Sequence, residues 1–186
     1  MPRKRRDMPT SLDEYRRLRD TRVGVDRTRT LSFYRTLSST VSIVSAMSEE
    51  LGPLGLTVSA VSAVSAEPPL LSVCLAHESQ TLRAAAESGR FAVHVLQAHQ
   101  RGLATEFATS NTPRFRAHGF AHTYGAPVLT EAETWTVCEV VDTCGYGDRT
   151  LLIGHVIHTH EGTKGAPLVW HDSSFLPVTE HQERDQ

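Results

Sequence analysis

The stretch from Gly55 to Pro69 constrains the fold of this chain more than any other part of the sequence. It reads Gly-Leu-Thr-Val-Ser-Ala-Val-Ser-Ala-Val-Ser-Ala-Glu-Pro-Pro and carries no charge before Glu67. Valine and threonine favour a pleated strand, and the proline pair is expected to end it. Its hydroxyl groups belong to Thr57, Ser59, Ser62 and Ser65. Because its small side chains leave the backbone open to a flat ligand, this strand is predicted to form a wall of a binding site.

Strand-like segments dominate the rest of the chain, and the helical patterns between them are short. The other predicted strands are 41–46, 70–76, 91–96, 135–141, 150–160 and 168–171. The predicted helices are 11–20, 26–38, 80–88 and 100–108, and residues 52–55 read as a turn. Long helices do not separate the strands regularly, so the pattern disfavours a doubly wound parallel sheet. It favours a mainly β fold, an antiparallel barrel with short helices at its rim.

The size and composition indicate one globular domain. The chain has 186 residues, 39% of them hydrophobic, and a formal net charge of −2. The expected organisation is a flexible basic segment over residues 1–25, one domain over 26–178 and a polar tail over 179–186. No apolar run is long enough to span a bilayer and no signal peptide is recognised, so a cytoplasmic protein without a membrane partner is expected.

The cysteines and the basic run give weaker signals. Cys74, Cys138 and Cys144 lie in apolar strand-like runs, which favours buried thiols in a reducing compartment and leaves a disulfide or a catalytic cysteine open. The basic run 3–6 reads as a solvated tail. Nothing later in the chain extends it, so no nucleic-acid partner is predicted.

Ten histidines raise the question of a metal site. His155, His158 and His160 share one predicted strand, where alternation places only the last two on the same face. No carboxylate or cysteine has a matching position, so no metal site is predicted. The sequence also shows neither a glycine-rich dinucleotide loop nor a nucleophilic serine at a strand-to-helix elbow.

An ordered set of segments resembles a known family, the flavin reductase-like proteins with an FMN-binding split barrel. This family includes the small reductase components of two-component flavin monooxygenases. The matching segments cover roughly residues 30 to 175 and are, in chain order, 33–37, 41–46, 55–60, Ser65 with 68–69, 73–75 with Ser79, 91–96 with Gln100, 103–104 with 107–108, 114–115, 138–140, 147–148, 154–156 and 167–171. The resemblance implies a split β-barrel, a Greek-key-like antiparallel barrel, and a homodimer.

The resemblance also implies where FMN or FAD binds. The flavin is expected along the segment before the first strand and along the serine-rich strand. A helix start offers free N–H groups and a positive dipole to its phosphate, although a plain N-cap is the alternative for the serine there. The implied flavin-binding residues are Ser39, Thr40, Val41, Thr57, Val58, Ser59, Ala60, Ser65, Ser79, Thr81 and Arg83.

The implied reaction is hydride transfer from NADH or NADPH to the flavin, which then supplies a partner monooxygenase. The implied nicotinamide-binding residues are Arg149, Trp170, His171 and Asp172, with core or dimer packing as the alternative for Trp170. Trp135 is expected to pack in the barrel. No acid–base residue is required for the hydride step, so no catalytic residue is assigned.

Three positions depart from the family pattern. Relatives often read Gly-Asp-His where this chain has Gly147-Asp148-Arg149, glycine where it has Thr40, and asparagine where it has His94. An arginine can bind a phosphate or a carboxamide oxygen but cannot donate a proton at neutral pH. The alternative function is therefore a divergent flavin-binding protein of a biosynthetic pathway that has lost the nicotinamide site.

Overall fold

The computed structural model describes residues 24–109, 115, 117–163 and 165–176. The predicted helix 11–20, the basic run and the tail 179–186 lie outside these residues. The chain divides into two compact units, residues 1–34 and 35–186, and each is described by itself. Within the described part, no helix is both long enough and apolar enough to cross a membrane.

Helix α2 (Arg27–Arg35) begins after Asp26, as predicted, but ends three residues before the predicted end. One carboxylate oxygen of Asp26 accepts hydrogen bonds from the main-chain N–H groups of Thr28 at 2.9 Å and Arg29 at 3.1 Å, which makes it the N-cap. No residue of α2 is buried.

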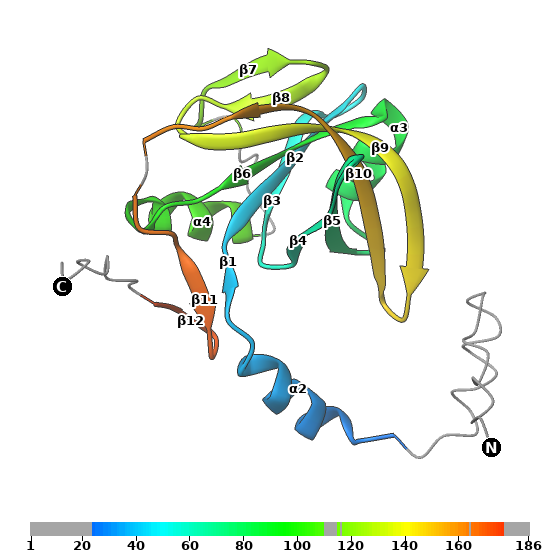
Figure 1. Cartoon of the computed structure of the whole chain (residues 1–186), viewed down its shortest axis with the longest axis vertical. Helices are drawn as coiled ribbons and strands as arrows, with labels where there is room; N and C mark the ends of the chain where they lie inside the picture. Colours follow the sequence, from blue (N-terminus) through cyan, green and yellow to red (C-terminus); the bar gives the residue numbers. More distant parts are fainter. Residues whose placement is uncertain (1–23, 110–114, 116, 164, 177–186) are drawn as a thin grey trace. The chain divides into compact units, whose positions relative to one another are not determined.

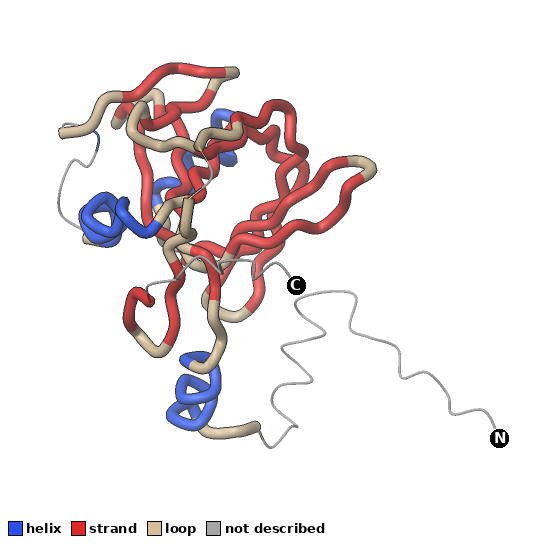
Figure 2. Tube along the Cα trace, turned by 60° about the vertical axis from the view of Figure 1, so that its left-hand side comes forward, coloured by secondary structure: helices blue, strands red, loops and turns tan. Residues whose placement is uncertain are grey.

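The larger unit is built on seven antiparallel strands (Figure 1). They are β2 (Ser42–Ser48), β3 (Gly52–Val58), β4 (Val61–Ala66), β5 (Pro69–Ala76), β6 (Arg90–Val95), β9 (Thr134–Tyr146) and β10 (Arg149–His160). Their order in the sheet is β3-β2-β6-β9-β10-β5-β4. Figure 2 shows how strands dominate this unit. The predicted turn at 52–55 is wrong, because these residues open β3.

The two edge strands of this sheet are consecutive in the chain. Only Ser59 and Ala60 separate β3 from β4, and seven alternating strands make the first and the last run in the same direction. The two strands therefore form one interrupted run, whose first half pairs with β2 and whose second half pairs with β5. This connection curls the sheet into a barrel. Along their described residues, β2 and β5 form no ladder with each other, so the barrel is split between them. The predicted mainly β split barrel is confirmed, but the serine-rich stretch is two strands.

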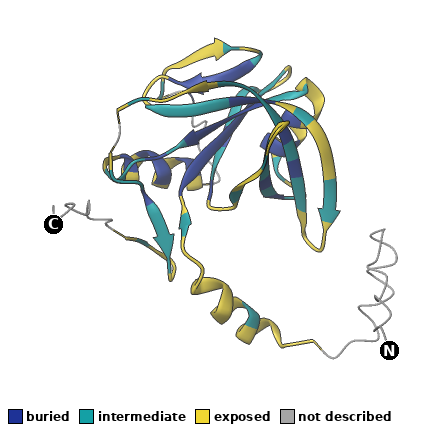
Figure 3. Cartoon of the chain, viewed as in Figure 1, coloured by how far each residue is buried: buried dark blue, intermediate teal, exposed yellow. Residues whose placement is uncertain are grey.

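Strand β2 separates two apolar cores. Val44 and Ala46 face the barrel interior with Val73, Phe91 and Leu152. Ile43, from the alternate positions, packs with helix α4 (Arg101–Ala108), which follows the short 3₁₀ helix η1 (Ala98–Gln100). Figure 3 shows β2 and most of β6 as buried strands.

Helix α3 (Gln80–Ser88) has the predicted ends. The Ser79 hydroxyl accepts a hydrogen bond from the Leu82 N–H at 3.3 Å. Gly89 ends the helix with φ of 69°, a conformation that glycine adopts without strain.

Two small sheets complete the larger unit. The first joins β1 (Ser39–Thr40), β11 (Val169–His171) and β12 (Ser174–Leu176), and the second is the hairpin of β7 (Phe120–Thr123) and β8 (Ala126–Leu129). Of these strands the sequence predicted only β11. The first sheet positions much of the candidate site.

Candidate functional site

The β1–β11 ladder joins two groups of predicted residues. Ser39 lies opposite Trp170, and Thr40 lies opposite Val169. The next residue, Val41, donates its N–H to the Leu168 carbonyl at 2.8 Å. The structure therefore brings the predicted flavin segment 39–41 together with the predicted nicotinamide segment 170–172.

Side chains and main chain reinforce this ladder. The Ser38 hydroxyl lies 2.9 Å from Nδ1 of His171. The Asp172 N–H donates to the Arg35 carbonyl at 3.0 Å, and Asp172 itself has a left-handed φ of 44°. Trp170 is half-buried, and its ring meets Phe175 edge-on at 5.0 Å between centroids. Trp170 thus packs against Phe175 and keeps an exposed part that can contact a ligand.

The link between β3 and β4 lies at the same end of β2. Val58, the last residue of β3, pairs with Ser42, the first residue of β2. Because the two strands are antiparallel, Ser59 lies next to Val41. Both link residues are exposed, and the Ala60 carbonyl accepts the Cys74 N–H at 3.0 Å. We call the surface of Ser39–Thr40, Ser59–Ala60 and Val169–His171 the split edge.

Other predicted flavin residues are engaged elsewhere. The Thr57 hydroxyl donates to the Ala104 carbonyl of α4 at 2.7 Å, and the Val58 side chain belongs to the core. Ser65 is on β4 and lies opposite Leu70 of β5. It is five residues beyond Ala60, or about 17 Å along a strand, so the structure does not bring Ser65 to the split edge.

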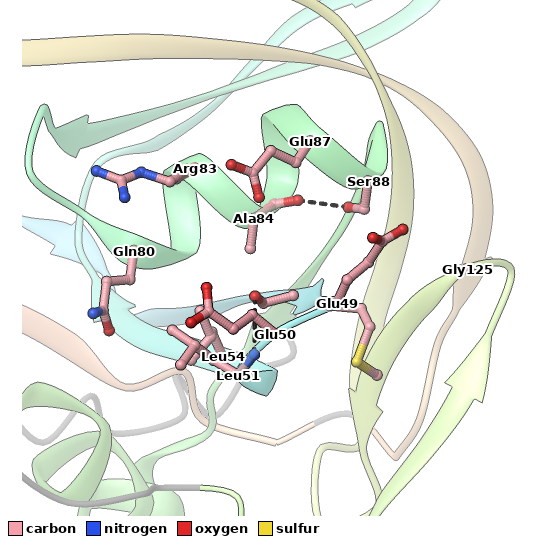
Figure 4. Close-up of a pocket in the computed structure, with 12 residues that line it drawn as sticks. Glu49, Glu50, Leu51, Leu54, Gln80, Arg83, Ala84, Glu87, Ser88 and Gly125 are labelled. Atoms are coloured by element: carbon pink, nitrogen blue, oxygen red, sulfur yellow. Dashed lines mark hydrogen bonds between the residues drawn. The ribbon is translucent and has the colours of Figure 1, made fainter.

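The α3 turn contains Ser79, Thr81 and Arg83, which face different surroundings. Ser79 acts as the cap, and Thr81 is 3% exposed. Arg83 is exposed and lines a cavity of about 680 Å³ between α3 and the β2–β3 turn (Figure 4).

This cavity has the wrong charge for a phosphate. Glu49, Glu50 and Glu87 line it, and Arg83 is the single cation among its lining residues. Three carboxylates around one guanidinium repel an anion at neutral pH. Arg83 is therefore a poor candidate for binding a flavin phosphate.

Arg149 lies at the base of the β9–β10 hairpin tip. It pairs with Ala76 on β5 and with Tyr146 on β9. Its side chain is 55% exposed, and its nearest carboxylate is that of Asp148, 4.0 Å away. In Figures 1 and 2 this tip and β11 lie at separate places in the same unit, so one chain does not bring Arg149 to Trp170.

Sequence reasoning missed His77, which follows β5 and contacts this hairpin. Its Nδ1 lies 2.7 Å from the Thr150 hydroxyl oxygen, and its Nε2 lies 3.1 Å from the Gly147 carbonyl oxygen. The signal available was a histidine two residues before the helix cap Ser79.

His94 lies inside the core and outside any candidate site. It is fully buried. The Ile43 carbonyl accepts from Nδ1–H at 3.0 Å, and Nε2 accepts the Leu129 N–H at 3.1 Å. Burial lowers the pKa of His94 to about 4, although the bond to Ile43 opposes the shift. The ring is thus a neutral link between β2, β6 and β8.

The strand histidines stack on aromatic rings. Trp135 is half-buried and packs on the α4 core and on a third apolar cluster of Ala92, Ala126, Val128 and Val137. It therefore lies outside the barrel-interior core, where it was expected. Its ring lies 5.3 Å from that of His158 and 5.2 Å from that of His160, as expected for histidines sharing a face. Among the residues with described positions, no three His, Cys, Asp or Glu side chains are grouped to hold a metal ion.

The fold and the split edge define a split-barrel protein of the flavin reductase type. A family model described as "Flavin reductase like domain" matches residues 34–179, and the chain belongs to this family. The resemblance noted from the sequence is thereby confirmed.

Individual relatives agree with this assignment. The NADH:FMN oxidoreductase of Rhodococcus qingshengii is 34% identical over 134 residues, which are 69% of this chain and 70% of the relative. The actinorhodin polyketide dimerase of Streptomyces coelicolor is 36% identical over 139 residues, 74% of this chain and 78% of the relative. The crystal structure of BorF, the flavin reductase component of a bacterial two-component tryptophan halogenase, is 25% identical with a TM-score of 0.74, and the match covers 83% of this chain and 99% of BorF.

Proposed function

We propose that this protein is an oxidoreductase, an NAD(P)H:flavin reductase that uses FMN or FAD. The β1–β11 ladder carries the proposal, because it places the predicted flavin segment beside Trp170 and His171. The activity named for the Rhodococcus relative supports it.

The residues of the split edge fit a flavin. Ser59 and Ala60 are small and exposed, so a flat ring can approach their backbone. Beside them, Ser42 is 1% exposed, and its hydroxyl is the one buried side-chain N or O atom of the described residues without a hydrogen-bond partner. An unpaired buried hydroxyl costs about 1–3 kcal/mol, which a polar ligand edge at this place would offset.

A bound flavin supplies the chemistry by accepting a hydride from NADH or NADPH, which leaves as NAD⁺ or NADP⁺. The protein has to hold the two flat rings together and exclude water, and it needs no acid or base of its own. Ser39, Thr40, Ser59 and Ala60 are the proposed flavin contacts. Trp170, His171 and Asp172 are the proposed dinucleotide contacts.

We infer that the working form is a homodimer. Arg149 and Trp170 lie apart in one chain, so a second copy is needed to bring one protomer's hairpin to its partner's β11. Val141 and Tyr146 on that hairpin are 56% and 54% exposed, which supports a partner surface there. In this arrangement a mixture of Arg149→Ala and Trp170→Ala proteins regains about a quarter of wild-type activity, because half of the dimers are mixed and each has one intact site. No recovery, or a monomer by light scattering, would contradict the homodimer.

A partner oxygenase receiving the reduced flavin is the proposed physiological acceptor. The structural relative BorF is the flavin reductase component of a two-component tryptophan halogenase, which supports a partner of this kind. The three free thiols of Cys74, Cys138 and Cys144 support a reducing, cytoplasmic location.

The direct test mixes the purified protein with FMN or FAD and follows the absorbance of NADH and NADPH. Flavin-dependent loss of that absorbance is expected, and the faster combinations identify both cofactors. Flavin binding without any dinucleotide oxidation would refute the reductase.

The second candidate is a flavin-using or flavin-binding protein of a biosynthetic pathway without a nicotinamide site. The dimerase name of the Streptomyces relative favours it, as does Arg149 in place of the family histidine. The Arg149→Ala variant discriminates between the two, since it weakens dinucleotide use only in a reductase.

A further inference from the structure

His77 lies where the α3 turn meets the tip of the β9–β10 hairpin. Besides its ring contacts with the Thr150 hydroxyl and the Gly147 carbonyl, its main-chain N–H donates to the Asp148 carbonyl at 3.5 Å. A carbonyl can only accept, so Nε2 carries the proton and Nδ1 of the neutral ring accepts from Thr150. Both ring nitrogens are therefore occupied by the hairpin.

The hairpin also makes room for this ring. Gly145 is opposite Thr150 in the β9–β10 ladder. A Cβ built at Gly145 would lie 3.3 Å from Cε1 of His77, tighter than most such contacts. The imidazole thus packs over a position without a side chain, and three residues between 147 and 150 hydrogen-bond to His77.

The side chain that this arrangement positions is Arg149. It lies between Asp148 and Thr150, both of which His77 contacts, and it pairs with Ala76, the residue before His77. Alternation along β10 turns the Arg149 side chain to the face opposite Thr150. Any effect of the imidazole on the guanidinium therefore has to pass through the hairpin backbone.

We propose that His77 is a positioning residue that holds the hairpin tip so that Arg149 presents its guanidinium to the anionic dinucleotide. Arg149 has one weak ion-pair partner at 4.0 Å and a largely exposed side chain, so little besides the backbone fixes its position. A guanidinium binds a phosphate with paired hydrogen bonds, which lose strength when their geometry shifts. This inference rests on the proposed reductase function.

The test is a double-mutant cycle of His77→Ala and Arg149→Ala, with steady-state kinetics at saturating flavin. We expect His77→Ala to raise KM for the reduced dinucleotide about tenfold, the scale of one lost hydrogen-bonded contact. We expect kcat and the flavin Kd to change by less than about twofold. In the Arg149→Ala background, His77→Ala should add less than about twofold, because its target is gone.

Two further variants sharpen the test. Thr150→Val removes one hydrogen bond to the ring at nearly constant volume, and it should raise KM in the same direction even if His77→Ala fails to fold. His122→Gln changes an exposed histidine on β7, and its KM should equal that of the wild type.

Three outcomes would overturn the inference. If His77→Ala raised KM by the same factor in the wild-type and the Arg149→Ala proteins, His77 would not act through Arg149. If KM stayed unchanged in both His77→Ala and Thr150→Val, the contact between His77 and the hairpin would be irrelevant. A wild-type protein without flavin-dependent dinucleotide oxidation would overturn the proposed function, and this inference with it.

Discussion

His94 should make the stability of this protein depend on pH in a calculable way. The ring is fully buried, and both nitrogens are used in the neutral form, Nδ1–H toward the Ile43 carbonyl and Nε2 toward the Leu129 N–H. Protonation would turn Nε2 into a donor facing another donor. Its pKa is about 4 in the folded protein, against an ordinary value of 6.5.

The sign and size of the effect follow from linkage. Between pH 6.5 and 4 the unfolded chain binds more protons at this residue than the folded chain, so acidification favours unfolding. Each pKa unit corresponds to about 1.36 kcal/mol, and the shift therefore amounts to about 3 kcal/mol. This loss begins near pH 6.5, is complete near pH 4, and is large against a typical stability of about 5–15 kcal/mol.

The assay compares wild type with His94→Gln by urea unfolding from pH 7 to pH 4, monitored by tryptophan fluorescence. At pH 7 the variant should be about 1–3 kcal/mol less stable, because Gln reaches the two main-chain groups less well. Since Gln does not titrate, only the wild type loses about 3 kcal/mol by pH 4, so the variant should there be as stable as the wild type or more stable. The variant His122→Gln should track the wild type throughout. A difference that stays constant from pH 7 to 4 would refute the buried neutral ring.

Four other predictions concern stability and reactivity. Burial lowers the pKa of His118, but its hydrogen bonds to Glu106 and Glu131 outweigh this and raise it. The stability that His118 contributes should therefore be fully present below about pH 6.5 and lost as the pH rises through its pKa in the folded protein. When Glu106 and Glu131 are both changed to Gln, an NMR titration should show a lower pKa for His118. Gly154→Ala should destabilise the protein by about 1–3 kcal/mol in urea unfolding, since its Cβ would overlap two buried side chains. Gly102→Ala, in a helix with open space around it, should stabilise the protein by up to about 1 kcal/mol. Cys138 is buried and has a pKa raised by burial to about 12, so a thiol reagent should modify the other two cysteines first; equal rates would contradict its burial.

The fold was largely predictable where strands follow a local pattern. Residues 52–55 show why the rest was not: Gly52-Pro53-Leu54-Gly55 has the composition of a turn, yet it opens β3. Proline is tolerated there because β3 is an edge strand, where a residue can lack an N–H without breaking a ladder on both sides. Its edge position depends on the whole sheet and cannot be read from four residues.

The hairpin β7–β8 escaped prediction for a local reason. Its two-residue turn is Tyr124-Gly125, with φ of 48° and 85°. Such turns usually carry Asn-Gly or Asp-Gly, and tyrosine rarely adopts a positive φ. Stacking of the Tyr124 ring on His158 at 4.7 Å gives it a contact that no sequence rule anticipates.

The candidate site depends on non-local pairing. The segments 39–41 and 169–171 were each expected near the cofactors, but their direct pairing follows from the ladder alone. His77 was missed because a single exposed histidine after a strand carries no signal until the hairpin that contacts it is placed.

The three departures from the family pattern do not bear equally on function. His94 is explained by the core, where its ring links main-chain groups of two strands. Thr40 pairs regularly with Val169 and is not among the described residues with positive φ, so its backbone does not require the freedom of glycine. Arg149 remains the departure that neither core packing nor backbone conformation explains, and His77 holds the hairpin that carries it. The Arg149 guanidinium is therefore the feature of this chain that distinguishes a reductase from a divergent flavin protein.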